Sequence, residues 1–270
     1  MIADLSQSTL AYTPFLPPSF TFHLSSRMTD KFTVIREVAT GVWTFSRPFT
    51  RLGILPVGGR STAIKLSNGG VWVLASTALN PETKAKIDEL GPVQFIISPD
   101  AVHHLYLGEF KKAYPTAKLI APAAAVARAD KTLTFDGVWG RDPPETKYGF
   151  EEDIRACYFS GFKNKDVAFF HPASKTMVEA DLLFNLPCTE QYSKTKSSGS
   201  IPFLGALGPS AWLHQKFAAS MGEDKAAMKR DVKTVADWDF TRIIPCHGDV
   251  IETGGKQAWL DAYKVYLDPA

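Results

Sequence analysis

The chain has 270 residues, of which 45% are hydrophobic and 21% are charged, enough to build a sizeable apolar core. Its 30 Lys and Arg residues nearly balance 28 Asp and Glu residues, and the net charge of +2 favours neither nucleic acid nor an anionic membrane as a partner. A small molecule is therefore the expected partner. Three cysteines without paired spacing exclude a disulfide framework and predict a reducing, cytoplasmic location: Cys157, Cys188 and Cys246.

Residues 1–30 are expected to form a poorly structured extension, because this segment is rich in Ser, Thr and Pro. A cleaved signal peptide is not favoured, since Asp4 comes early and prolines interrupt any apolar stretch. No apolar run approaches the roughly 20 residues that a membrane span requires. The remainder, 31–270, is predicted to be one domain.

The first half of that domain begins with β-branched and aromatic runs, 32–49 and 62–76, which are separated by glycine-containing turns and predict antiparallel strands. The segment NPETKAKIDEL then predicts a helix with an asparagine cap and a proline in its first turn. The apolar run VQFII predicts a strand buried on both faces. A helix at 104–115, the strand AKLIAP and a helix at 123–130 follow, and 131–150 is expected to be irregular.

The second half repeats this order, with strands IRACYFSG, DVAFFHP, TMVEADLLF and TRIIPCHG, and a terminal helix at 257–267. Strands followed by alternating strands and helices, twice over, predict two mixed sheets packed face to face with helices outside, an α/β fold of the αββα sandwich type. An insert at about 188–222 mixes Gly, Ser and Pro with large apolar residues. It is expected to form either a pocket wall or a loop packed on the surface.

Polar residues follow three of the predicted strands. Asp100, His103 and His104 come after VQFII, Asp181 comes after TMVEA, and His247 comes after TRIIPC. Because the carboxyl ends of strands converge on one edge of a sheet-based fold, these side chains are expected to share a pocket. Histidine nitrogens and a carboxylate oxygen are suitable ligands for Zn, Fe or Mn. The sequence therefore predicts a metal site.

The order of these motifs resembles the metallo-β-lactamase-fold superfamily over about residues 33–267. A strand followed by SPDAVHH, a strand with FSGF, a strand ending in ADLLF and a strand ending in PCHG carry the resemblance. The resemblance is to a degenerate, little-characterised branch of the superfamily, a domain of unknown function. The resemblance implies the αββα fold and metal-dependent hydrolysis.

The first metal site of the superfamily has no ligands at the matching positions. When the signature H-x-H-x-D-H is laid on 99–104, Pro99 and Ala101 stand where the first two histidines would be. The next histidine of the superfamily falls at Phe162. The resemblance therefore implies that only a second site remains.

That second site keeps a full set of ligands. His104 falls on the last histidine of the signature, Asp181 on the bridging aspartate and His247 on the final histidine, while His103 replaces the aspartate with another candidate ligand. The resemblance thus implies one divalent metal ion, zinc in the first place, with iron or manganese as alternatives. Its candidate ligands are His103, His104, Asp181 and His247.

The roles within this group stay open at this point. The two histidines are expected to open a helix, where adjacent side chains point about 100° apart. Only one of them is therefore expected to bind the metal directly, and the other to lie behind it. His104 is the better candidate ligand. Asp181 is also consistent with capping a turn. Asp100 either caps the helix or orients a ligand, and Asp100 with His103 are the candidate catalytic residues.

Candidate substrate-binding residues are aromatic and would suit an apolar substrate, although side chains of this kind more often belong to the core. They are Phe162, Phe203 and Trp212. The histidines outside the candidate site are expected at the surface or in loops. They are His23, His171 and His214.

The predicted function is hydrolysis of a small ester, lactone, thioester or amide, because one metal ion can acidify a water molecule and polarise a carbonyl group. Phosphodiester cleavage is less favoured, since it commonly uses two metal ions. Two alternatives remain. The same ligands suit a non-haem iron oxidoreductase, and the fold can also persist as a non-catalytic binding module.

Overall fold

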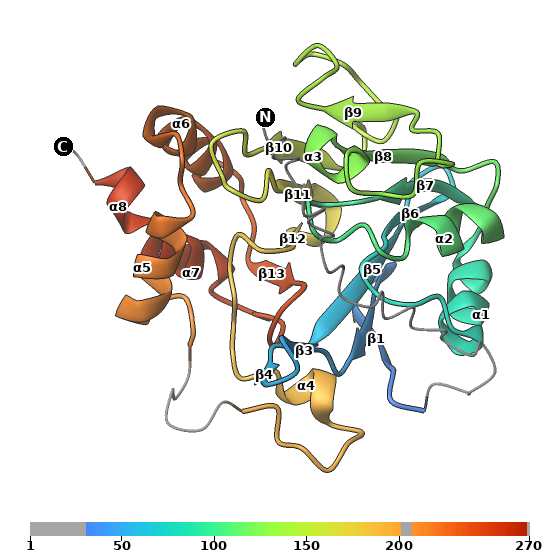
Figure 1. The fold of residues 1–270 in the computed structure, drawn as a ribbon, viewed down its shortest axis with the longest axis horizontal. Helices are drawn as coiled ribbons and strands as arrows, with labels where there is room; N and C mark the ends of the chain where they lie inside the picture. The colour runs from blue at the N-terminus through green and yellow to red at the C-terminus, as the bar shows by residue number, and fades with distance from the viewer. Residues whose placement is uncertain (1–30, 201–206, 269–270) are drawn as a thin grey trace, which may run out of the picture.

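Two β-sheets lie face to face with helices on both outer sides, as expected from the sequence (Figure 1). A computed structural model of the protein describes residues 31–200 and 207–268. The helices between residues 81 and 126 lie beside the larger sheet, and those between residues 212 and 267 lie beside the smaller one. The αββα sandwich is therefore confirmed, whereas the predicted extension at 1–30 lies outside the described residues.

The larger sheet has seven strands in the order β1-β2-β5-β6-β7-β8-β9. Its first four strands pair antiparallel, and the pairs from β6 to β9 are parallel. Parallel pairs need crossover connections, and α1, α2 and the short α3 provide them. The strands are β1 (Val34–Ala39), β2 (Val42–Arg47), β5 (Gly59–Lys65), β6 (Val71–Leu74), β7 (Val93–Ile97), β8 (Lys118–Pro122) and β9 (Gly137–Trp139).

The smaller sheet has four strands in the order β10-β11-β12-β13, with a parallel pair at β12 and β13. A separate hairpin, β3 with β4, leaves the larger sheet after β2. The strands are β10 (Arg155–Tyr158), β11 (Val167–His171), β12 (Thr176–Glu179), β13 (Arg242–Pro245), β3 (Thr50–Arg51) and β4 (Leu55–Pro56).

The helix predicted at NPETKAKIDEL is confirmed, including its cap. The side chain of Asn80 accepts a hydrogen bond from the backbone N–H of Thr83 at 2.8 Å, and Pro81 occupies the first helical position. The helices are α1 (Pro81–Leu90), α2 (Leu107–Ala113), α3 (Ala123–Val126), α4 (Thr189–Tyr192), α5 (Trp212–Ser220), α6 (Lys225–Ala236), α7 (Gly255–Ala262) and α8 (Lys264–Leu267).

The core lies in three layers, because successive side chains of a strand point to opposite faces. On β11, Phe169 packs between the sheets and its neighbour Phe170 packs beneath the C-terminal helices. On β6, Trp72 faces the space between the sheets and Val73 faces α1 and α2. Strands buried on both faces explain the continuous apolar runs in the sequence.

Several local predictions differ from the structure. The helix expected from 104 begins at Leu107, so the two histidines lie in the preceding loop. The region 131–150 contains β9, and the terminal helix is divided into α7 and α8. His171 and His214, expected at the surface, are buried with exposures of 6% and 0%. Burial is explained by their positions, since one ends a central strand and the other faces inward from α5.

Within the described ranges, no helix is long and apolar enough to cross a membrane. All three cysteines are free and buried.

Candidate metal site

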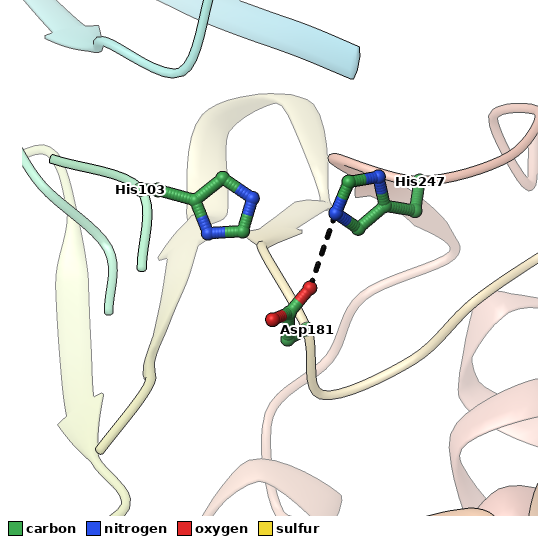
Figure 2. A group of neighbouring side chains, drawn as sticks. All are labelled: His103, Asp181 and His247. Carbon is green, nitrogen blue, oxygen red and sulfur yellow. Dashed lines mark ion pairs between the residues drawn. The ribbon is translucent and has the colours of Figure 1, made fainter. Parts of the chain in front are cut away.

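Three side chains from distant parts of the chain meet at one edge of the sandwich (Figure 2). His103 comes from the loop after β7, Asp181 follows β12, and His247 follows β13. One ligand atom of each lies within 4.8 Å of those of the other two. The ends of strands from both sheets thus bring together a group that has the chemistry of a metal site.

Asp100 orients the imidazole ring of His103. This fully buried carboxylate accepts hydrogen bonds from the backbone N–H groups of Val102 and His103, each at 2.8 Å, and its Oδ1 lies 2.8 Å from His103 Nδ1. We assign the Nδ1 proton to this contact, since it lets the ring donate to the carboxylate. Nε2 is then left to face the site.

His247 is oriented in the same way by a backbone carbonyl. Its Nδ1 lies 2.6 Å from the oxygen of Gly58, and a carbonyl oxygen can only accept, so Nδ1 is the donor. Nε2 lies 3.2 Å from Asp181 Oδ1, the contact drawn in Figure 2. Phe49 stacks on the ring at 6.2 Å between centroids, and Phe184 meets it edge-on at 5.1 Å. The ring is therefore held from both sides.

Asp181 brings a carboxylate oxygen with no hydrogen-bond partner among the described residues. Its Oδ2 accepts from Asn164 Nδ2 at 2.5 Å, and its backbone N–H donates to Asp166 Oδ2 at 2.7 Å. Its Oδ1 is buried, and it faces the two imidazoles without a hydrogen bond. A buried, unsatisfied anionic oxygen is costly unless a cation or proton lies beside it.

The pKa shifts describe the same arrangement. Burial would lower the pKa of His103, but the carboxylates of Asp100 and Asp181 outweigh burial and raise it to about 9. Burial would raise the pKa of Asp181, but the two imidazoles hold it below its usual value. The site thus favours positive charge next to the Asp181 carboxylate, as a metal ion would supply.

Two further carboxyl groups lie just beneath the site. Asp166 and Glu179 are fully buried, and burial raises the pKa of both well above the usual range. The neighbouring Asp100 and Asp181 carboxylates raise the pKa of Asp166 further. Burial therefore disfavours additional negative charge beneath the three side chains.

The donor set fits one divalent ion. Two imidazole nitrogens and one carboxylate oxygen are three protein ligands, the number typical of zinc sites that keep a coordination position open for water or substrate. Both imidazoles have Nδ1 hydrogen-bonded and Nε2 directed into the site, the arrangement found when histidine binds a metal. A metal ion would displace the proton that the raised pKa keeps on Nε2 of His103. Iron and manganese accept the same donors.

His104 lies outside this group, although the sequence favoured it over His103. Its Nδ1 lies 3.2 Å from the carbonyl oxygen of Ala101, and burial lowers its pKa. The three contacts that Asp100 makes fold the loop so that His103 faces Asp181. The structure thus brings three of the four predicted ligands together.

The positions of the first metal site of the superfamily hold apolar, buried residues. Pro99 and Ala101 are buried in the loop after β7. Phe162 has no exposed surface and packs with Leu182 and Met228 under the C-terminal helices. None of these side chains offers a metal ligand.

The predicted substrate-binding residues do not meet at the site. Phe162 belongs to the core rather than to a pocket wall. Trp212 is 65% exposed at the start of α5, where Lys216 lies over its ring. Phe203 lies outside the described residues. The insert instead contributes to a small core cluster through Leu207 and Phe217.

A cavity of about 300 Å³ opens above the three candidate ligands, all of which line it. Its walls come from the segment after β2, from the ends of β5 and β6, and from the loop before α2. Phe49, Leu105 and Tyr106 give these walls an apolar character, and Thr77 adds a hydroxyl group. The volume is at the lower end of the range for small-molecule sites.

Sequence reasoning missed the residues that hold the loop of His247. Arg60 is fully buried and donates from Nη1 to the carbonyl oxygens of Pro245 and Gly248, at 2.5 and 2.7 Å. Gln191 makes two hydrogen bonds to the same loop. Its Nε2 donates to the carbonyl oxygen of Cys246, and its Oε1 accepts from the backbone N–H of Gly248. The sequence did carry one signal for Arg60, which is a charged residue within an otherwise uncharged part of the strand GRSTAIK.

Comparison with protein-family models assigns the chain to a family. A family model described as a domain of unknown function (DUF4336) matches residues 40–198, and the protein belongs to that family. The match includes His103 and Asp181, and His247 lies beyond it. A search of curated proteins finds no match.

Solved structures share the fold at low sequence identity. A metallo-β-lactamase from Hirschia baltica is 12% identical with a TM-score of 0.55, covering 88% of this chain and 99% of its own. The mono-zinc form of the metallo-β-lactamase FIM-1 from Pseudomonas aeruginosa is 14% identical with a TM-score of 0.54, covering 87% and 97%. A flavoprotein from Thermotoga maritima is 11% identical with a TM-score of 0.60, covering 88% and 62%. The protein therefore has the metallo-β-lactamase fold.

Proposed function

We propose that the protein is a metal-dependent hydrolase that uses a single divalent ion, zinc in the first place, on a small ester, lactone, thioester or amide. The buried Oδ1 of Asp181, unsatisfied and facing two imidazole rings, carries this proposal. His103, Asp181 and His247 would hold the ion. Bound there, it would act as a Lewis acid that lowers the pKa of a water molecule and polarises a substrate carbonyl.

The chain's own residues prepare the site for this chemistry. Asp100 keeps the proton of His103 on Nδ1, and Gly58 keeps that of His247 on Nδ1, so neither ring needs to change tautomer when a ligand binds. Asn164 fixes the Asp181 carboxylate through Oδ2. The rings of Phe49 and Tyr106 give part of the cavity an apolar wall, and electrostatic interactions are stronger beside apolar surfaces than in open water. Asp100 therefore serves as a positioning residue.

Metal analysis of the purified protein tests the proposal first. We expect close to one equivalent of zinc per chain after reconstitution, and chelator-sensitive cleavage in a screen of lactones, esters and thioesters. Well below one metal per chain would contradict every metal-dependent function and favour a non-catalytic binding module. One metal per chain without cleavage of any of these substrates would contradict the hydrolase alone.

A non-haem iron oxidoreductase is the second candidate, because two histidines and one carboxylate are also the ligands of oxygen-activating iron sites. Metal identity separates the two candidates. Iron that is retained through purification, together with oxygen consumption, would favour the oxidoreductase. Zinc, together with release of protons on substrate cleavage, would favour the hydrolase.

A further inference from the structure

Two arginines lie in the wall of the cavity, on the strand and hairpin next to the candidate metal site. Arg47 is the last residue of β2, Arg51 belongs to β3, and both line the cavity. Asp181 is the only carboxylate among the described lining residues, and it contacts His247 and Asn164. The part of the cavity wall formed by β2 and β3 therefore carries positive charge.

Arg51 contributes more of this charge than Arg47 does. Glu109 on α2 lies within electrostatic reach of Arg47, which counteracts the rise that burial causes in the pKa of Glu109. Arg51 is exposed, and no ion pair found in residues 31–200 and 207–268 involves it. A guanidinium group matches the planar geometry of a carboxylate and can bind both of its oxygens.

Exposed apolar side chains surround the same opening. Phe49 and Leu105 line the cavity and are nevertheless 45% and 74% exposed. On the hairpin that carries Arg51, Leu52 and Ile54 are 83% and 77% exposed. Apolar side chains that gather at the mouth of a cavity mark a surface that binds an apolar group.

We infer that the cavity takes an amphiphilic acyl compound whose carboxylate lies against Arg51, with a contribution from Arg47, and whose apolar chain lies against Phe49 and Leu105. This deepens the proposed hydrolase and rests on it for the reaction, but binding itself needs no catalysis. A carboxylate on an apolar chain satisfies the guanidinium and covers the exposed apolar wall together. A neutral compound of the same shape leaves the arginine without its partner.

Calorimetric titration of the metal-loaded protein with octanoate and with octan-1-ol tests the inference. The two probes share one chain and differ in charge. We expect octanoate to bind about tenfold more tightly than octan-1-ol. Arg51→Gln should reduce this preference to within about twofold and leave metal content unchanged. Arg141→Gln is the matched control, because Arg141 is exposed and does not line the cavity.

Equal affinity for the two probes, or binding of neither, would overturn the inference. A preference for octanoate that survives in both Arg51→Gln and Arg47→Gln would also overturn it, since the carboxylate would then be held by the metal site itself. Neither probe contains an ester, thioester or amide bond, so the result is independent of activity. Binding through Arg51 without cleavage of any ester would contradict the proposed function and leave this inference standing.

Discussion

The guanidinium group of Arg60 lies 2.7 Å from the carbonyl oxygen of Gly248, one residue beyond His247. The same nitrogen reaches Pro245, so one buried arginine holds the loop on both sides of a candidate ligand. The Ser46 hydroxyl group and the Glu190 carboxylate hold the guanidinium in turn, at 2.8 and 3.4 Å. The position of His247 therefore depends on a residue that offers no ligand atom.

Replacing Arg60 with lysine should weaken metal binding without removing a ligand. Lysine keeps the charge but has one nitrogen in place of three, so it cannot bond the two carbonyl oxygens, Ser46 and Glu190 together, and the loop is held less firmly. We expect zinc affinity to fall roughly 10- to 100-fold, as for other residues that orient metal ligands. Competition with a chromophoric chelator measures this, and Arg141→Lys on the surface serves as the control. Unchanged affinity in Arg60→Lys would mean that the loop holds its shape by itself.

Alanine substitutions in the loop after β7 distinguish the two adjacent histidines. His103→Ala should abolish stoichiometric metal binding, because it removes one of three ligands, and His247→Ala should do the same. His104→Ala should retain close to one metal per chain, since this ring contacts the backbone of Ala101 instead. Elemental analysis after gel filtration gives the result. The opposite outcome for His103 and His104 would refute the assignment.

Asp100→Asn should reduce metal affinity less than removal of a ligand does. An asparagine oxygen can still accept the two backbone hydrogen bonds, but a neutral group stabilises the oriented imidazole less. In the metal-free protein the pKa of His103, raised to about 9, should fall, because the Asp100 carboxylate is the largest of the charges that raise it. A titration of the His103 ring by NMR measures that pKa. No change would show that the Asp100 carboxylate is not responsible for the raised pKa.

Much of the fold could be predicted from local patterns. The apolar runs of β6, β7 and β11 indicate strands buried on both faces, and Asn80 with Pro81 marks the start of α1. These signals are local, because a strand or a cap is determined by residues a few positions apart. The short hairpin β3–β4 escaped prediction, since two-residue strands leave almost no pattern.

The site could be predicted only in part. Strand ends located Asp181 and His247, but the choice between His103 and His104 depends on three contacts to Asp100 that fold the loop. Arg60 bonds residues that lie 185 and 188 positions away, and no local pattern encodes such a pairing. Long-range hydrogen bonds of this kind appear only when the tertiary structure is known.

Phe162→His should not rebuild a first metal site. Pro99 and Ala101 would still supply no ligands, and the new imidazole would lie in the core beside Leu182 and Met228. We expect metal content to stay at that of the unmodified protein, and the free energy of unfolding to fall by about 3 kcal/mol from lost packing and a buried polar group. Urea denaturation and elemental analysis measure the two quantities. A second equivalent of metal would contradict this expectation.

Stability should depend on pH through His214, which is buried on α5 and accepts a hydrogen bond from the backbone N–H of Phe184 at 2.9 Å. Burial lowers its pKa to about 4, whereas the unfolded chain has the ordinary value near 6.5. Between these values the unfolded state binds a proton that the native state does not. The stabilisation is therefore complete above about pH 6.5 and is lost as the pH falls toward 4, by about 2 to 3 kcal/mol.

His214→Gln isolates this contribution, because a glutamine oxygen can accept the same backbone hydrogen bond and does not titrate. We expect the unmodified protein to lose more stability than the variant between pH 7 and pH 4.5. Urea denaturation at the two pH values measures the change in unfolding free energy for each protein. Subtracting one change from the other removes the contribution of every titrating group that the two proteins share. Parallel pH profiles for the two proteins would mean that His214 is protonated without cost in the native state, in conflict with its burial.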